Sequence, residues 1–181
     1  MVNKKYTAGI YKSISLFFFL LLSVSVQAQD ISKYFTSHYQ EGGSLYFIFP
    51  QDGFVNESNK NPFTYDITYL VSKDTVTLNF SYLDASQIEI EKLSLKTEEG
   101  SKSFKTKKIF VESEDEKWHH RYTALIPYAD IKALFKQHEL QPKLALVCES
   151  EHIDLCIKAS KWEKQSSIIS KIFMEIDANQ K

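Results

Sequence analysis

Residues 63–82, FTYDITYLVSKDTVTLNFSY, alternate apolar with polar side chains on either side of a polar centre. Alternation with period two predicts two strands, each with one buried face, joined as a hairpin. A two-residue turn at 73–74 (Lys-Asp) sets apolar or aromatic residues opposite one another, in the pairs Val71–Val76, Tyr69–Leu78, Ile67–Phe80 and Tyr65–Tyr82. A shift by one residue would set apolar side chains opposite polar ones, so this face is predicted to be buried. Lys-Asp is not a favoured pair for the primed turns of short hairpins, which leaves the turn type open.

Further segments of the chain have the same strand-like pattern. Aromatic residues make up 14% of the chain while Gly and Pro are scarce, and this balance favours half-buried pleated surfaces. Within 88–96 the apolar positions change from even to odd numbers, which predicts a β-bulge near Glu91 and Lys92. The other predicted strands are 44–50, 104–112, 118–127, 143–149 and 152–159.

Two segments have helical periodicity instead. In the first, Ile131, Leu134 and Phe135 fall on one face, and Asp130 lies in the first turn, where the helix dipole favours an acidic residue. In the second, Ser160 is a candidate N-cap for an apolar stripe made of Trp162, Ile169, Ile172, Phe173 and Ile176. We therefore predict a mainly β fold, a two-sheet antiparallel sandwich or an incomplete barrel. It carries a short helix near 128–138 and a C-terminal helix near 161–177.

The first 28 residues belong to a different class of segment. Three lysines precede an apolar run that contains FFFLLL, and Val26-Gln27-Ala28 ends it with a small-residue pattern, so residues 1–28 are predicted to be a cleaved signal peptide. The alternative is an uncleaved N-terminal anchor, although the run is short for a membrane span. No cysteine follows the run, so the usual acceptor of a bacterial lipid anchor is missing. We expect residues 29–43 to form a lead-in, either a short helix or a partly ordered segment, and residues 44–181 to form a single β-rich domain.

Charge bears on the class of partner. Removing the predicted signal peptide takes away three lysines and no acidic residue, so the remaining chain is mildly acidic. Because binding to phosphate backbones depends on clustered basic charge, nucleic acid is not an expected partner.

The sharpest chemical question is posed by residues 117–122, KWHHRY. On a strand, successive side chains point to opposite faces, so the adjacent imidazoles of His119 and His120 cannot converge on one ion. The apolar even positions, which include Trp118 and Tyr122, place His120 on or near the core face. His119 and Arg121 are then predicted to form a small exposed cationic spot.

The two cysteines invite a disulfide in an exported chain. With a turn at residues 150–151, however, Cys148 opposes Ile153 while Cys156 opposes Ala145, which puts the sulfurs on opposite faces and out of register. A disulfide would need an irregular hairpin. The other outcome is a buried Cys148 and a more exposed Cys156 thiol.

Local catalytic patterns are not found in the sequence. It contains no H-E-x-x-H, C-x-x-C, G-x-S-x-G or P-loop motif. We therefore assign no catalytic, cofactor-binding or metal-binding residues, expect no cofactor, and leave the binding residues unknown.

The exit sequence SVQAQD and the stretch PFTYDITYL…DTVTLNFSYLD resemble small exported proteins of the Bacteroidota, of an uncharacterised β-sandwich type. This resemblance implies export and a strand-rich fold, and it carries no catalytic residue across.

The leading hypothesis is an exported protein, periplasmic or secreted and not lipid-anchored, that acts as a non-enzymatic binding or accessory module. Its partner would be a protein, a glycan or a small ligand, and no stable membrane span would remain after signal cleavage. One alternative is an envelope hydrolase whose groups meet only in the fold. Another is a carrier that holds a small apolar ligand in an aromatic-lined cavity.

Overall fold

The computed structural model describes residues 31–97, 100–136, 142–149 and 151–180, and the structural statements below concern these residues. All of them except Ile31 belong to one compact unit, Ser32–Lys181. The predicted signal peptide, residues 1–28, lies outside the described residues. With 55% of residues in strands and 21% in helices, the predicted mainly β class is confirmed.

The elements follow in chain order. The strands are β1 (Phe35–Gln40), β2 (Gly43–Ile48), β3 (Phe54–Asn56), β4 (Pro62–Leu70), β5 (Thr75–Asp84), β6 (Ile90–Thr97), β7 (Gly100–Glu114), β8 (Lys117–Pro127), β9 (Lys143–Cys148) and β10 (His152–Cys156). The helices are α2 (Tyr128–Lys136) and α3 (Ala159–Ala178).

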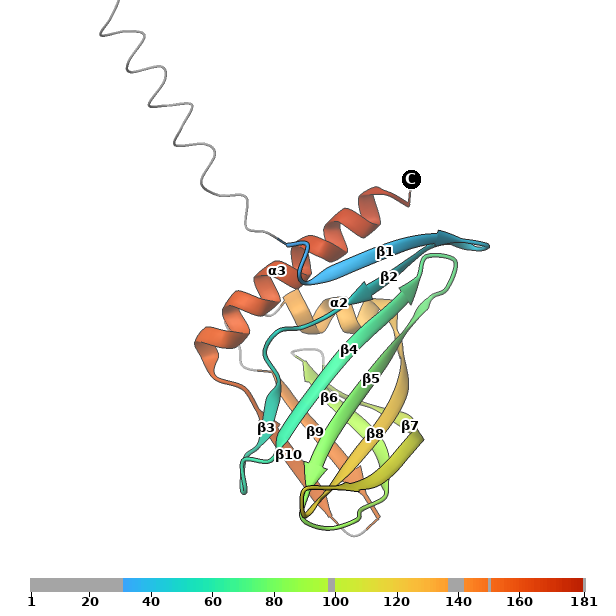
Figure 1. Ribbon diagram of the computed structural model, residues 1–181. Helices are drawn as coiled ribbons and strands as arrows, with labels where there is room; N and C mark the ends of the chain where they lie inside the picture. Colours follow the sequence, from blue (N-terminus) through green and yellow to red (C-terminus); the bar gives the residue numbers. More distant parts are fainter. Residues whose placement is uncertain (1–30, 98–99, 137–141, 150, 181) are drawn as a thin grey trace, which may run out of the picture. The chain divides into compact units, whose positions relative to one another are not determined.

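Eight of the strands form a closed antiparallel barrel (Figure 1). Around the ring the order is β4-β3-β10-β9-β6-β7-β8-β5, and pairing of β5 with β4 completes it. The remaining two strands form a ribbon in which β2 pairs with residues 67–70 of β4, beyond the point where β3 pairs with residues 62 and 63. The two-sheet sandwich is therefore wrong. The other predicted architecture, an incomplete barrel, is confirmed as a barrel, but the ring is closed.

The closure depends on the longest strand. The first part of β7 pairs with β6 and its last part pairs with β8, with a register shift between Lys108 and Phe110. A bulge of this kind bends a strand and lets it turn a corner, so β7 can pair with strands on both sides and leave no open edge in the ring.

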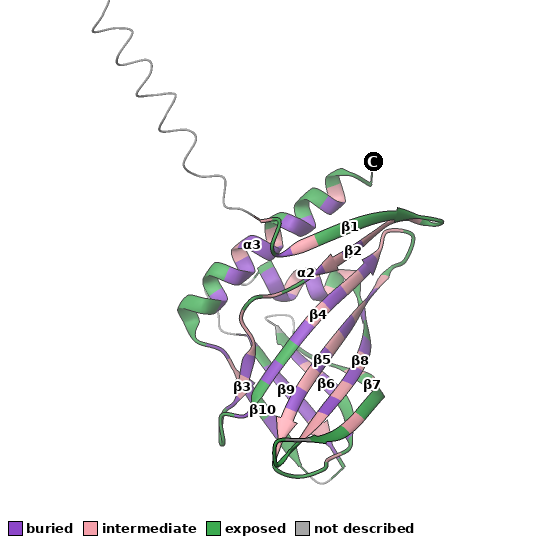
Figure 2. Ribbon diagram, viewed as in Figure 1, coloured by how far each residue is buried: buried purple, intermediate pink, exposed green. Residues whose placement is uncertain are grey.

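Side chains fill the interior of the barrel according to the alternation in the sequence. Along β4 and β5 every second residue is buried, which Figure 2 shows as alternating colours. The ring of Phe80 lies between those of Phe63 and Tyr122, with centroids 5.2 and 5.9 Å away. Aromatic burial of this size supplies much of the stability of a small domain.

Both helices lie at the end of the barrel where β4 ends and β5 begins (Figure 1). The backbone N–H of Tyr128 donates to the carbonyl of Asp74, which ties the start of α2 to the β4–β5 loop. Trp162 of α3 packs between Phe54 and Phe135, at centroid distances of 6.1 and 5.3 Å. The two predicted helices are confirmed. α3 begins at Ala159, however, and its N-cap is Lys158, which makes no side-chain capping bond, so Ser160 is not the cap.

Four details differ from the sequence-based predictions. The hairpin β4–β5 pairs Tyr65 with Phe80 and Ile67 with Leu78, two residues away from the predicted register, because the chain uses a four-residue loop at 71–74. The same face is buried, since a shift of two preserves parity. The hairpin β9–β10 is also shifted by two and pairs Ile153 with Leu146. In the predicted lead-in, Phe35–Gln40 forms strand β1 and not a helix. Strand β3 was not predicted, because it lies in a segment rich in polar residues that resembles a loop.

Candidate functional site

His120 lies on the inner face of the barrel, at the end opposite the helices. Its side chain is 0% exposed. Nε2 accepts the backbone N–H of Ile88 at 3.1 Å, so Nδ1 carries the proton and donates to the carbonyl oxygen of Tyr82 at 3.2 Å. The prediction that His120 lies on or near the core face is thus confirmed. Burial lowers the pKa of His120, against the opposing effects of its backbone bond to Tyr82 and the charge of Asp84.

A second group of polar side chains surrounds Asp84 at the same end. One carboxylate oxygen, Oδ2, accepts the Tyr82 hydroxyl at 2.8 Å and the Asn61 amide at 3.0 Å. The Tyr82 oxygen in turn accepts from Asn56 Nδ2 at 2.9 Å. Burial opposes ionisation of Asp84, but hydrogen bonds from the Ser86 N–H, Tyr82 and Asn61 prevail and lower its pKa. These groups satisfy one another, which is the usual state of buried polar atoms.

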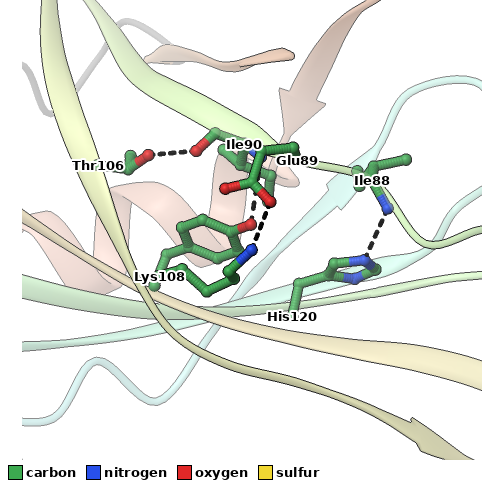
Figure 3. Close-up of polar contacts among 7 residues, drawn as sticks. Ile88, Glu89, Ile90, Thr106, Lys108 and His120 are labelled. Atoms are coloured by element: carbon green, nitrogen blue, oxygen red, sulfur yellow. Dashed lines mark hydrogen bonds and ion pairs between the residues drawn. The ribbon is translucent and has the colours of Figure 1, made fainter. Parts of the chain in front are cut away.

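Beside His120, the chain entering β6 is held to the barrel by further side chains (Figure 3). The N–H of Ile90 donates to the Tyr122 hydroxyl at 3.3 Å, and the Thr106 hydroxyl donates to the Ile90 carbonyl. Glu89 pairs with Lys108 at 2.7 Å. These contacts fix the segment between β5 and β6 against the barrel.

The other half of KWHHRY points outward, as predicted. Arg121 pairs with Asp66 at 2.5 Å and donates to Ser81 Oγ at 3.1 Å, and His119 stacks edge-on against Phe110 with 5.1 Å between ring centroids. Both side chains are half-buried and the arginine is neutralised, so the expected exposed cationic spot is wrong. Within the described part of the chain, no cluster of three or more His, Cys, Asp or Glu residues could hold a metal ion.

The two cysteines do not form a disulfide with each other. Both are free thiols, with Cys148 buried and Cys156 of intermediate exposure. Burial raises the pKa of Cys148 to about 11, with a further contribution from nearby acidic residues.

A concave site with unbalanced charge lies between α2 and α3, and we call it the helix groove. Its volume is about 320 Å³, and it is lined by Lys132, Lys136, Ser170, Phe173, Met174 and Asp177. Met174 is 62% exposed, so the lining of the groove includes accessible apolar surface.

The charges of the helix groove are only partly compensated. Asp177 accepts from Lys132 Nζ at 2.7 Å and from the Tyr128 hydroxyl at 2.8 Å, so both carboxylate oxygens are engaged. Burial opposes its ionisation, but these two bonds and the charges of Lys132 and Lys136 lower the pKa of Asp177. Burial and the adjacent carboxylate raise the pKa of Tyr128. Among the described residues none forms an ion pair with Lys136, so the groove carries one excess positive charge.

Sequence reasoning did not find the helix groove. The spacing held part of the signal, because Lys132 and Lys136 are four residues apart, as are Ser170 and Met174, and such pairs share a helix face. An exposed methionine directly after a core phenylalanine was a further sign. The way in which α2 and α3 pack against each other depends on the tertiary structure and cannot be read from this spacing.

No protein-family profile matches the chain, and neither a curated protein nor a solved structure is significantly similar to it. Neither described helix combines the length and apolar character that crossing a membrane requires.

Proposed function

We propose that this protein is exported and acts as a non-enzymatic binding protein, with the helix groove as its site for a small amphipathic carboxylate. The observation that carries the proposal is the groove of about 320 Å³ with an unpaired lysine at one side and an exposed methionine at the other.

The excess positive charge of the helix groove favours a negatively charged ligand. Lys132 is already paired with Asp177 and lies over the Tyr128 ring, 4.8 Å from its centroid. Lys136 lies in the last turn of α2 and remains available for an anion. A carboxylate bound there would complete the balance of two cations and two anions.

The volume and the apolar lining of the helix groove indicate the kind of chain that the ligand carries beside its carboxylate. The groove volume falls at the small end of ligand sites, which span roughly 300–1,000 Å³. Phe173 and Met174 offer apolar surface beside the lysines, and methionine adapts to irregular apolar shapes. A short or medium alkyl chain fits this description better than a complete lipid.

Two further observations favour this reading over the alternatives. A hydrolase that used His120 as its base would need an accessible ring nitrogen, whereas both ring nitrogens of His120 are engaged inside the protein. An apolar carrier needs free space inside the barrel, whereas the ring of Phe80 packs there between the rings of Phe63 and Tyr122.

The test of the site is a titration of the protein with octanoate, followed by calorimetry and by amide chemical shifts. We expect saturable binding, with shifts concentrated at residues of α2 and α3. Octanol, which has the chain without the charge, should bind more weakly. Because Lys136 is exposed, an ion pair there contributes up to about 1 kcal/mol, so Lys136→Ala should weaken octanoate binding by up to about fivefold.

The matched control is Lys171→Ala, which removes a lysine of α3 that does not line the groove. It should leave the octanoate affinity unchanged. Equal losses in both variants would indicate general attraction to positive charge, and an absence of saturable binding would overturn the assignment of the groove.

Export needs its own measurement. Expression of the full chain in a bacterial host should yield a processed form that begins after Ala28, detected as the intact mass of protein from the periplasm or medium. Retention of residues 1–28 on all of the protein would contradict the proposal of a cleaved signal.

A further inference from the structure

The strand β1 is the terminal strand of the ribbon that branches from the barrel. One of its edges pairs with β2, in a register that runs from Phe35 opposite Ile48 to Gln40 opposite Gly43. Its other edge pairs with no strand in the described part of the chain. Figure 1 shows β1 on the side of the ribbon away from β4.

One hydrogen bond identifies the backbone groups that face this open edge. The N–H of Phe49 donates to the carbonyl of Tyr34 at 2.7 Å, which continues the β1–β2 ladder by one residue. Hydrogen-bonded positions alternate along an antiparallel pair, so the even residues of β1 bond to β2. The N–H and C=O groups of Phe35, Ser37 and Tyr39 therefore point to the open edge.

The open edge lacks the features that usually prevent strand association. The sequence of β1, FTSHYQ, contains no lysine and no proline, and its pairing with β2 has no bulge. Residues 36–40 are exposed, as Figure 2 shows, and Tyr39 reaches 87% exposure. An uncharged, regular and aromatic edge is a template for another strand.

We propose that β1 pairs with β1 of a second copy of this chain, antiparallel and with Ser37 opposite Ser37 of the other copy. In that register Phe35 lies opposite Tyr39 of the other copy, and the reverse pair forms by symmetry. All the outward backbone groups identified above then find partners.

The register satisfies two independent conditions. Residues directly opposite each other in a sheet share a face, and a two-fold axis through Ser37 pairs odd residues only with odd ones. The same residues carry the free backbone groups. A shift by one residue would pair odd with even residues and meet neither condition. An axis through Thr36 or His38 also pairs odd residues with odd ones, but it pairs only two of the three outward-facing residues within β1, whereas the axis through Ser37 pairs all three.

Side chains also fit a second copy. Phe35 already lies against Tyr46 of its own chain, with ring centroids 6.3 Å apart, and the incoming Tyr39 would extend this cluster. On the other face Thr36 would meet His38 of the other copy. The contact is confined to one strand per copy, so we expect a reversible dimer at the low end of interface size.

The test is site-specific cross-linking of the full chain with Cys156→Ser as background, since Cys148 is buried. Hydrogen-bonded antiparallel partners have Cα atoms about 5.5 Å apart, within the range of a disulfide. Ser37→Cys should therefore form an intermolecular disulfide under mild oxidation. Thr36→Cys, one residue away, should form at least tenfold less, because Thr36 would not meet itself.

A second variant tests association without cross-linking. Ser37→Pro removes an outward N–H and no bond to β2, and edge strands accept proline at such positions. Sedimentation equilibrium should show a monomer–dimer equilibrium for the unmodified chain and an association constant at least tenfold lower for Ser37→Pro. A chain that stays monomeric at high concentration, a dimer unaffected by Ser37→Pro, or equal cross-linking at both cysteines would overturn the proposal. Binding of a different protein's strand at β1 without self-association would also overturn it.

Discussion

The imidazole of His120 accepts a hydrogen bond from the backbone N–H of Ile88, across 32 residues of sequence and 3.1 Å of space. This bond joins the inner face of β8 to the segment that crosses from β5 to β6. From the sequence, His120 resembled a metal ligand. In the structure both of its ring nitrogens bind backbone groups, so the residue stabilises this end of the barrel.

Replacing His120 by phenylalanine should destabilise the protein by about 2–4 kcal/mol. The ring volume is nearly kept, but the buried N–H of Ile88 loses its acceptor and the Tyr82 carbonyl loses a donor, each at about 1–3 kcal/mol. His38→Phe is the control, since its exposed side chain keeps a ring beside Phe47 and the change should cost less than about 0.5 kcal/mol. Urea unfolding followed by tryptophan fluorescence measures both. Similar losses in the two variants would refute a special role for the inner histidine.

Stability should fall as the pH drops below about 6.5, the ordinary pKa of histidine. Burial lowers the pKa of His120 in the folded protein, so the unfolded chain binds the extra proton first. The contribution of His120 to the free energy of unfolding is complete above pH 6.5. As the pH falls from 6.5 to the lowered pKa, this contribution decreases by no more than about 1.4 kcal/mol per pH unit. Its neighbours act in both directions, because the carboxylate of Asp84 favours the proton and His119 opposes it.

Urea midpoints between pH 7.5 and pH 5 provide the measurement of this effect. The slope attributable to His120 should vanish in His120→Phe. Asp84 has a lowered pKa and loses its contribution in a separate range, below its ordinary value of 3.8, so the two effects can be told apart. A wild-type slope that persists unchanged in the variant would assign the pH dependence to other groups.

The two thiols should differ strongly in reactivity at pH 8. Cys148 is buried, and its pKa of about 11 keeps it protonated, so the thiolate that reacts is scarce. Cys156 is partly exposed and should be alkylated first by iodoacetamide. Mass spectrometry should find one rapid modification in the folded protein and two in urea. In Cys156→Ser the rapid modification should disappear; its persistence would place the reactive thiol at Cys148.

The sequence predicted the parts of the fold that depend on local pattern. Alternation of side chains in β4, β5 and β8 correctly placed one face inside, because period two is a property of any extended strand. It put His120 inward and Arg121 outward for the same reason. The bulge near Glu91 appears as a register shift between Ile90 and Lys92, since a change of parity in the apolar pattern is also a local signal.

Register and turn length were less accessible. Moving a hairpin by two residues leaves every side chain on the same face, so the pattern cannot distinguish the predicted register of β4–β5 from the observed one. The loop at residues 71–74 determines which of the two registers forms. Lys73 and Asp74 are poorly suited to a primed turn, and the N–H of Lys73 bonds instead to the carbonyl of Leu70.

By itself, the sequence determined a strand-rich chain with two amphipathic helices and a core histidine, because each of these follows from the spacing of neighbouring residues. Only the tertiary structure decided that the strands close into a barrel, that Lys136 and Met174 share a groove, and that the open edge of β1 presents Phe35, Ser37 and Tyr39. These relationships join residues far apart in the chain. They are set by which edges and faces remain unpaired once the core has formed, and no local period encodes that outcome.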